Sequence, residues 1–280
     1  MAKIYYTLYD RMLSYARIRQ AFFKVKAARG APGIDKVTID EYERELDKNT
    51  NLLVKQLREK AYRPLAVREI EIPKLTGGTR KLGVPAVRDR VVQQALLNIL
   101  QPIFEPEFHP SSYAYRPGRG PHHAIAKAAL FIRKYDMKWV VDMDIAKCFD
   151  TLDHTLIIQA FRKRIADGSI LNLIKMYLQS GVMKGEGWRA TTIGSAQGSV
   201  ISPLTANVYL NSFDQNFKER NYRLIRFADD IRIFKETKGA AENALKQAKK
   251  YLEKHLKLKV NQEKTQVIHA SEGIDFLGVK

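Results

Sequence analysis

The chain has 280 residues, of which 48 are lysine or arginine and 30 are aspartate or glutamate, so its formal net charge is +18. This length suffices for one large domain or two smaller lobes, and the basic excess indicates a polyanionic partner, for which nucleic acid is the usual one. The single cysteine, Cys148, excludes an internal disulfide and a zinc site built from cysteines. Because no apolar run approaches the roughly 20 residues of a membrane span and no signal-peptide pattern opens the chain, we expect a cytoplasmic protein with no membrane partner.

The N-terminal region is predicted to be helical. Apolar residues recur at every third or fourth position over residues 4–29, and Gly30 is predicted to end that helix. A second helix is predicted over residues 39–60. A third, with Asp89 in its first turn, is predicted to end at Pro102. By composition alone these are ordinary elements of a helical bundle.

The pattern changes after Pro64. Residues 67–73 alternate between apolar and polar, which predicts a strand, and Gly77-Gly78 predicts a turn before a returning strand. Lys74 and Arg80 flank the tip of this hairpin, where an arginine could bind phosphate in a bidentate fashion. Taken by itself, such a hairpin fits a solvated surface loop better than a phosphate site.

Residues 113–119 combine tyrosines with arginines. Tyr115 could stack on bases, and Arg116 and Arg119 could bind phosphates of a nucleic acid. A buried aromatic turn with solvated arginines explains the same residues. His122 and His123 follow, but no acidic or cysteine partner lies at ligand spacing, so we do not interpret them as metal ligands.

Two acidic segments carry the strongest functional signal. Residues 139–145 are mostly apolar and predict a buried strand that ends near Asp144, whereas residues 223–234 predict a tight β-hairpin around Asp229 and Asp230. Adjacent carboxylates repel, so a cation is expected there, although a solvated turn explains an isolated Asp-Asp pair. If the two segments meet, three carboxylates suit two Mg²⁺ ions about 3.5–4 Å apart, an arrangement that drives phosphoryl transfer.

The two acidic segments resemble motifs of a known protein family. Residues 139–150 and 223–234 resemble the first and third catalytic motifs of a reverse transcriptase palm, with Phe227-Ala228-Asp229-Asp230 as the signature. Residues 196–210 resemble the intervening motif of reverse transcriptases encoded by bacterial group II introns, except that Ala196 replaces the usual proline. Further resembling blocks lie at 31–45, 113–119, 258–265 and 274–278.

The resemblance implies an α+β fold with the fingers and palm of a right-hand polymerase, in which an antiparallel palm sheet packs on helices. Residues 1–135 are then expected to be mainly fingers and residues 136–280 mainly palm, with part of 160–200 at the junction. A thumb is expected to be lacking.

The resemblance also implies an RNA-directed DNA polymerase of the group II intron type, which adds deoxynucleotides to a primer with two Mg²⁺ ions, or with Mn²⁺ in their place. The implied catalytic and metal-binding residues are Asp144, Asp229 and Asp230, together with the carbonyl of Ile145. The implied nucleotide-binding residues are Lys74, Arg80, Phe149, Gln197, Gly198 and Lys264. The implied template- and primer-binding residues are Tyr115, Arg116, Arg119, Phe276, Leu277 and Gly278.

Two of these residues have more specific expected roles. Phe149 lies five residues after Asp144, where the resembling enzymes place an aromatic ring that leaves no room for a 2′-hydroxyl. A core phenylalanine in a strand-to-helix turn is the alternative. Lys264 is a candidate proton donor to pyrophosphate.

The expected partners are an RNA template, a DNA or RNA primer, deoxynucleoside triphosphates and, as a further candidate, intron RNA. Two alternatives stay open: an RNA-binding maturase or splicing cofactor whose palm is only a scaffold, and a reverse transcriptase associated with a CRISPR locus. The pattern around Gln197 and Ser202 argues against a diversity-generating element. Ala228 and Phe149 argue against an RNA-dependent RNA polymerase, which usually has glycine before the paired aspartates.

Overall fold

The structure is a computed structural model that describes residues 3–73, 78–185 and 187–279. The chain divides into two compact units, here called unit 1 (residues 1–104 and 154–205) and unit 2 (residues 105–153 and 206–280). The chain crosses between units three times, whereas the boundary expected from the sequence is a single cut after residue 135. The assignment of the units to fingers and palm therefore stays a prediction.

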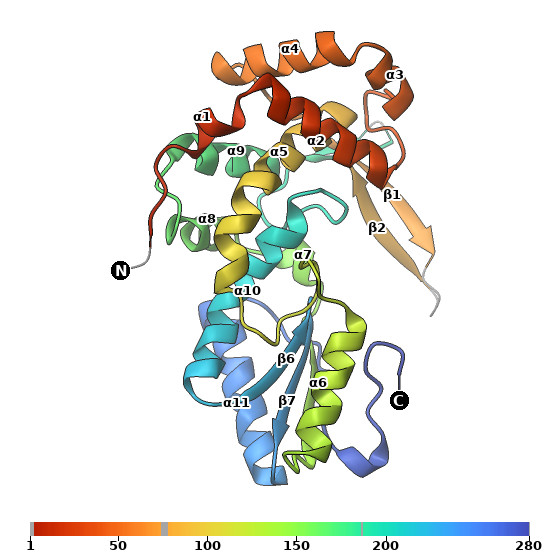
Figure 1. Cartoon of the computed structure of the whole chain (residues 1–280). Coiled ribbons are helices and arrows are strands. Elements are labelled where there is room, and N and C mark those ends of the chain that lie inside the picture. Colours follow the sequence, from red (N-terminus) through yellow and green to blue (C-terminus); the bar gives the residue numbers. More distant parts are fainter. Residues whose placement is uncertain (1–2, 74–77, 186, 280) are drawn as a thin grey trace. The chain divides into compact units, whose positions relative to one another are not determined.

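Unit 1 contains helices and one small sheet (Figure 1). Its elements are α1 (Leu8–Met12), α2 (Tyr15–Ala28), α3 (Ile39–Arg44), α4 (Leu46–Arg58), β1 (Val67–Pro73), β2 (Thr79–Val84), α5 (Val87–Phe104), α8 (His154–Arg162), α9 (Gly168–Leu178), β4 (Val182–Lys184) and β5 (Gly187–Arg189).

Three helix predictions in unit 1 need correction. The helix predicted over 4–29 is two helices, because the Ser14 side chain accepts a hydrogen bond from the Arg17 amide and caps a new start. The helix predicted over 39–60 is likewise divided at Glu45. Helix α5 does not end at Pro102 but continues to Phe104, since a proline in the last turn removes only one backbone hydrogen bond.

The sheet of unit 1 has the strand order β2-β1-β4-β5. Strands β1 and β2 pair antiparallel from Arg68↔Val84 to Pro73↔Thr79, as the sequence predicts. Strand β4 adds in parallel to the other edge of β1, and β5 pairs antiparallel with β4. Lys74 falls outside the described residues.

Unit 2 contains a four-stranded antiparallel sheet with the order β6-β7-β3-β8. Its elements are the 3-10 turn η1 (Glu105–Glu107), α6 (Pro121–Arg133), β3 (Trp139–Asp144), α7 (Cys148–Thr151), β6 (Arg223–Phe227), β7 (Asp230–Lys235), α11 (Lys238–His255), β8 (Gln266–His269) and the 3-10 turn η2 (Ala270–Glu272). Helix α10 (Ser202–Glu219) begins in unit 1 and continues in unit 2.

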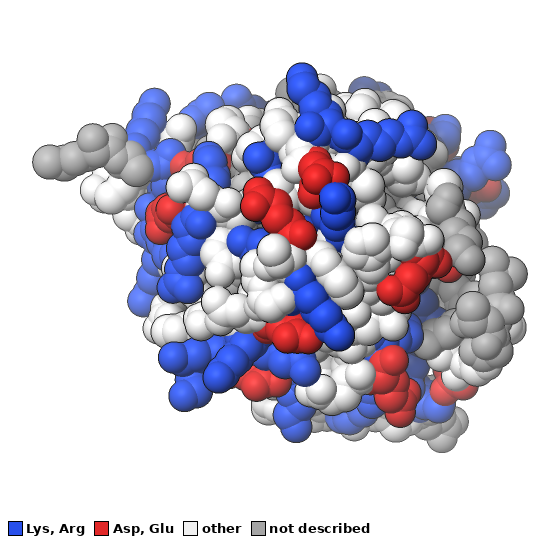
Figure 2. Space-filling model, turned by 90° about the horizontal axis from the view of Figure 1, so that it is seen from below, with Lys and Arg blue, Asp and Glu red and all other residues white. Residues whose placement is uncertain are grey.

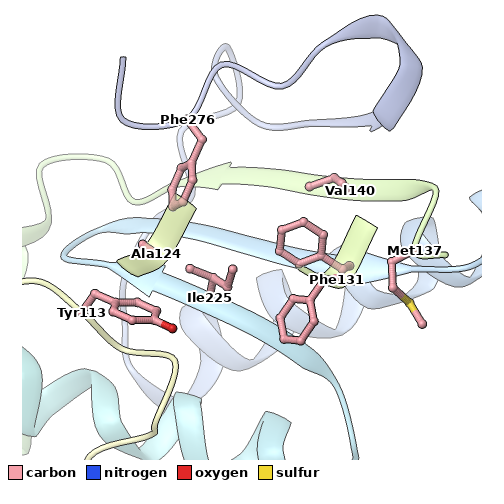
Figure 3. Close-up of a cluster of buried hydrophobic side chains, with 8 residues drawn as sticks. Tyr113, Ala124, Phe131, Met137, Val140, Ile225 and Phe276 are labelled. Carbon is pink, nitrogen blue, oxygen red and sulfur yellow. The ribbon is translucent and has the colours of Figure 1, made fainter. Parts of the chain in front are cut away.

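One face of the unit 2 sheet is apolar at one end and acidic at the other. Because side chains alternate along a strand, Val140 shares its face with Asp142 and Asp144, and Phe234 shares the same face with Asp230. The apolar end joins a buried cluster that includes Tyr113, Ala124, Phe131, Met137, Ile225 and Phe276 (Figure 3). Ala124 and Phe131 come from α6, which packs beside β6. The acidic residues at the other end of this face are not part of the apolar cluster.

These observations fit the α+β fold class expected from the sequence, with antiparallel strands packed on helices. No helix in the described ranges is long and apolar enough to cross a membrane. Lysine and arginine side chains surround much of the face in Figure 2, with acidic side chains among them.

Candidate active site

A two-residue turn carries Asp229 at the acidic end of the unit 2 sheet. Phe227 pairs with Asp230 across β6 and β7, so the loop consists of Ala228 and Asp229, and Asp230 is the first residue of β7. Ala228 has a φ of 58°. A positive φ at the first loop residue alone is the pattern of a type II′ hairpin turn, which normally has glycine there. The sequence predicts the hairpin correctly, but one aspartate lies in the loop and the other in the strand.

Asp144, at the end of β3, lies directly opposite Asp230. The Ile145 amide donates to the Asp229 carbonyl at 3.3 Å, which makes Asp144 and Asp230 a non-hydrogen-bonded pair. The Cα atoms of such a pair are about 4.5 Å apart and the side chains share one face. Asp144, Asp229 and Asp230, which the sequence predicts to act together, therefore lie at one end of the sheet.

Arg232 contacts this group from β7, and the sequence analysis missed it. Its Nη1 lies 2.5 Å from Asp230 Oδ1 and 2.7 Å from Asp142 Oδ1. Its guanidinium also lies 4.9 Å from the centre of the Phe276 ring. Burial raises the pKa of both Asp142 and Asp230, and Arg232 opposes that rise. Arg232 thus offsets negative charge where two carboxylates are partly desolvated.

Asp144 has different neighbours. Its Oδ2 accepts a hydrogen bond from Asn261 Nδ2 at 3.3 Å and lies 3.8 Å from Lys264 Nζ. The Lys264 side chain is 70% exposed, so its charge is well screened. The segment after α11 is held in place because the Asn261 amide donates to the Asp144 carbonyl at 2.9 Å. Lys264 thus lies close to Asp144, and its role as a proton donor stays a prediction.

The donor set suits a hard divalent cation. Carboxylate oxygens of the three aspartates are the ligands that Mg²⁺ prefers, and like charges directly opposite in a sheet are unfavourable unless something offsets them. Within the described ranges, no three Asp, Glu, His or Cys side chains are arranged to hold a metal ion by themselves. Asp230 is paired with Arg232, which also contacts Asp142. Phosphate or water oxygens would have to complete the coordination.

Two aromatic residues of the predicted site, Phe149 and Tyr115, contact each other in unit 2. Phe149, on α7, is 7% exposed, and its ring meets that of Tyr115 edge-on, with centroids 6.2 Å apart. Tyr115 is 48% exposed and has a φ of 61°. Phe149 is thus a buried side chain behind an exposed ring, which fits both a core residue and a wall of a nucleotide site.

The two arginines of residues 113–119 differ. Arg116 is 7% exposed, and it donates to the carbonyls of His109 and Ser112 and to the Glu105 carboxylate, at 2.7–2.8 Å. Its donors are committed to the protein rather than directed at a ligand. Arg119 is half-buried and donates to the Pro110 carbonyl.

Residues 276–279 form a tight turn. Phe276 and Val279 exchange two backbone hydrogen bonds, and Leu277 and Gly278 both have positive φ, as a type I′ turn requires. Phe276 is buried in the apolar cluster. Any primer contact by this segment would involve Leu277 and Gly278 rather than the phenylalanine ring.

The remaining predicted nucleotide-binding residues belong to unit 1. Arg80 Nε donates to Gln197 Oε1 at 2.8 Å, so two of them lie together. Gly198 has a φ of 103°, and a Cβ there would come within 2.4 Å of the Gly83 carbonyl oxygen. This glycine is needed for close packing against β2, and its implied contact with a nucleotide stays a prediction.

The chain is similar to several known proteins. Residues 72–280 match the profile of the family described as reverse transcriptase (RNA-dependent DNA polymerase). The protein YkfC of Escherichia coli is 34% identical over 90% of this chain and 76% of its own length. The group II intron-encoded protein LtrA of Lactococcus lactis is 26% identical over 98% of this chain and 54% of its own length. A chain of a solved Cas6-RT-Cas1–Cas2 complex matches 88% of this chain and 42% of its own, with a TM-score of 0.54 and 25% identity.

Proposed function

Because this chain belongs to the reverse transcriptase family and is related to group II intron-encoded proteins, we propose that it copies RNA into DNA by adding deoxynucleotides to a primer. The chain spans only about half of LtrA. Its activity at this length, its template and its primer are therefore parts of the proposal.

One observation carries the proposal: Asp144 lies directly opposite Asp230 and beside the turn that holds Asp229. Polymerase chemistry depends on positioning and charge neutralisation rather than on covalent work by the protein. A sheet end that concentrates three carboxylates meets that requirement. The alternative, a solvated turn, does not explain why a second strand end with a carboxylate lies directly opposite.

We propose that Asp144, Asp229 and the Ile145 carbonyl hold divalent magnesium, with Asp230 as a lesser ligand. When bound, such ions would activate the primer hydroxyl and offset phosphate charge. Asp230 has the supporting role because Arg232 already offsets its charge at 2.5 Å. Reverse transcriptases generally act with divalent metal ions, and the hard oxygen donors here fit that requirement.

The other residues of unit 2 would bind and select the nucleotide. The Phe149 ring would exclude a 2′-hydroxyl, and Tyr115 would support that ring from its exposed side. Lys264 would hold a proton near the leaving pyrophosphate, since its ammonium already lies within 3.8 Å of Asp144. In unit 1, Arg80 and Gln197 would contact the triphosphate and the new base pair.

The second candidate function is RNA binding as a splicing cofactor, which the net charge of +18 and the intron-encoded relatives favour. Primer extension on an RNA template with Mg²⁺ separates the two candidates. Asp229→Asn should lower extension at least about 100-fold while RNA affinity stays near the wild-type value. Asp275→Asn, which removes an exposed carboxylate on the adjoining segment, is the matched control and should extend normally.

The proposal fails if the wild-type chain binds RNA but extends no primer, or if Asp229→Asn extends as well as the wild type. The first result would favour the splicing cofactor.

A further inference from the structure

An arginine is buried on the face of the unit 2 sheet opposite the acidic end. Arg226, on β6, is 0% exposed, and so is Asp214 on α10. Arg226 Nε lies 2.9 Å from Asp214 Oδ1, and Nη2 lies 2.7 Å from Oδ2, which is a bidentate pair. Desolvation of two charges costs several kcal/mol, so a buried ion pair is weak evidence for a purely stabilising role. Another reason for this pair should exist.

The remaining donor of Arg226 supplies that reason. Its Nη1 donates to the carbonyl of Ala228 at 3.0 Å. Ala228 has a positive φ of 58°, a conformation that is unfavourable for a residue with a Cβ. Its neighbour is Asp229. Arg226 thus stabilises a turn with an unfavourable φ. The bond is to Ala228, which directly precedes Asp229, a carboxylate that the proposed chemistry requires.

Asn207, also on α10, links this turn to a second part of the site. Its Oδ1 accepts from Arg226 Nη1 at 3.0 Å, and its Nδ2 donates to the carbonyl of Ala114 at 2.9 Å. Ala114 directly precedes Tyr115, whose ring contacts Phe149. Asn207 is 1% exposed, so water does not replace these bonds. One buried amide therefore connects the Asp229 turn with the Tyr115–Phe149 pair.

We propose that Arg226 and Asn207 are positioning residues that fix the Asp229 turn relative to the Tyr115–Phe149 pair. They thereby control turnover and sugar selectivity together. Asp214 orients the arginine and contributes no bond to either segment. This inference rests on the proposed function, because it assigns to one network the alignment of a catalytic carboxylate and a sugar-excluding ring.

Asn207→Leu tests the inference because it keeps a similar volume and removes both bonds. Turnover with deoxynucleotides should fall by about 100-fold, the cost of a misplacement near 1 Å. Discrimination against ribonucleotides should fall roughly tenfold, at the low end of what pocket shape supplies. Asn207→Asp, which keeps the acceptor for Arg226 but not the donor to Ala114, should lose discrimination more than turnover.

The matched control is Tyr251→Phe. It deletes one hydrogen bond between α11 and α10, the helix that carries Asn207: Tyr251 Oη donates to the Ser212 carbonyl at 3.1 Å. It should lower stability without changing discrimination. If it changes discrimination as Asn207→Leu does, lost stability explains both results and the inference is wrong.

Hydrogen exchange gives a readout that needs no activity. Amide exchange should accelerate at residues 113–116 and 227–231 together in Asn207→Leu, and at neither segment in Tyr251→Phe. Unchanged exchange at both segments overturns the inference even if the protein extends primers. If Asn207→Leu does not fold, Asn207→Asp decides instead: exchange should accelerate at residues 113–116, whose bond it removes, and unchanged exchange there overturns the inference. Failure of wild-type extension counts against the proposed function alone.

Discussion

Asp214→Asn should strongly destabilise unit 2. The Arg226 and Asp214 side chains are 1% and 0% exposed, so no water replaces the lost charge. Three contacts between their nitrogens and oxygens are 2.7–3.0 Å long. Removal of one partner from a buried pair costs about 3–5 kcal/mol because the other charge stays buried. Asparagine keeps one acceptor oxygen, so we expect a loss near the lower end, about 3 kcal/mol.

The two tryptophans of the chain allow this loss to be measured in unit 2 alone. Trp139 is on β3 in unit 2 and Trp188 is on β5 in unit 1. In a Trp188→Phe background, urea unfolding followed by fluorescence reports on unit 2. With an m value of about 1–3 kcal/mol/M, a loss of about 3 kcal/mol lowers the urea midpoint by roughly 1–3 M.

Asp136→Asn is the matched control. It makes the same chemical change in unit 2, at an exposed ion pair with Lys138. The Lys138 side chain is 56% exposed and the Asp136 side chain is 77% exposed. Exposed pairs contribute about 0–1 kcal/mol, so its midpoint should stay close to the wild-type value. If Asp214→Asn shifts the midpoint no more than Asp136→Asn does, the buried pair does not hold unit 2 together and our reasoning is refuted.

Three further predictions concern single side chains. Phe149→Ala should raise ribonucleotide incorporation in single-turnover extension, and unchanged sugar selectivity would remove the role assigned to that ring. Burial raises the pKa of Asp89 to about 6, from 3.8; the folded state therefore holds a proton that the unfolded chain releases, and the free energy of unfolding should fall by about 2 kcal/mol as pH rises from 4 to 6. Asp89→Asn should abolish that slope in urea titrations, and a persisting slope would contradict this origin. Arg232→Gln leaves Asp142 and Asp230 without their cation, so its melting temperature should fall at pH 7 and rise with added Mg²⁺ more than that of the wild type. Equal Mg²⁺ responses would refute the assignment.

The hairpin and the acidic strand could be predicted because their signals are local. Alternating apolar residues predict β6 and β7, and the spacing of Asp229 and Asp230 identifies the turn between them. The break between α1 and α2 was also within reach, since Ser14 is a good N-cap residue. The apolar periodicity over residues 4–29 instead indicated one continuous helix.

The polar network under the turn could not be predicted in the same way. Arg226 and Asp214 are twelve residues apart on different elements, and no spacing rule pairs a helix residue with a strand residue. A partial signal existed, because Arg226 shares a sheet face with Leu224 and lies opposite Ile231. An arginine on an apolar face requires a buried partner. The identity of that partner depends on tertiary packing.

Arg232 carried a similar signal. It lies two residues after Asp230 and therefore on the same face. That parity places a cation among the carboxylates, a point that the sequence analysis did not use.

The most direct test of our account compares Asp144→Asn with Asp142→Asn in primer extension on an RNA template. Both residues are on β3 and share one face, but only Asp144 lies opposite Asp230. We predict that Asp144→Asn lowers the extension rate by at least about 1000-fold, equivalent to about 4 kcal/mol of barrier, and that Asp142→Asn stays within about tenfold of the wild type. Equal losses in both variants, or full activity without Asp144, would contradict the claim that this end of the sheet is the catalytic centre.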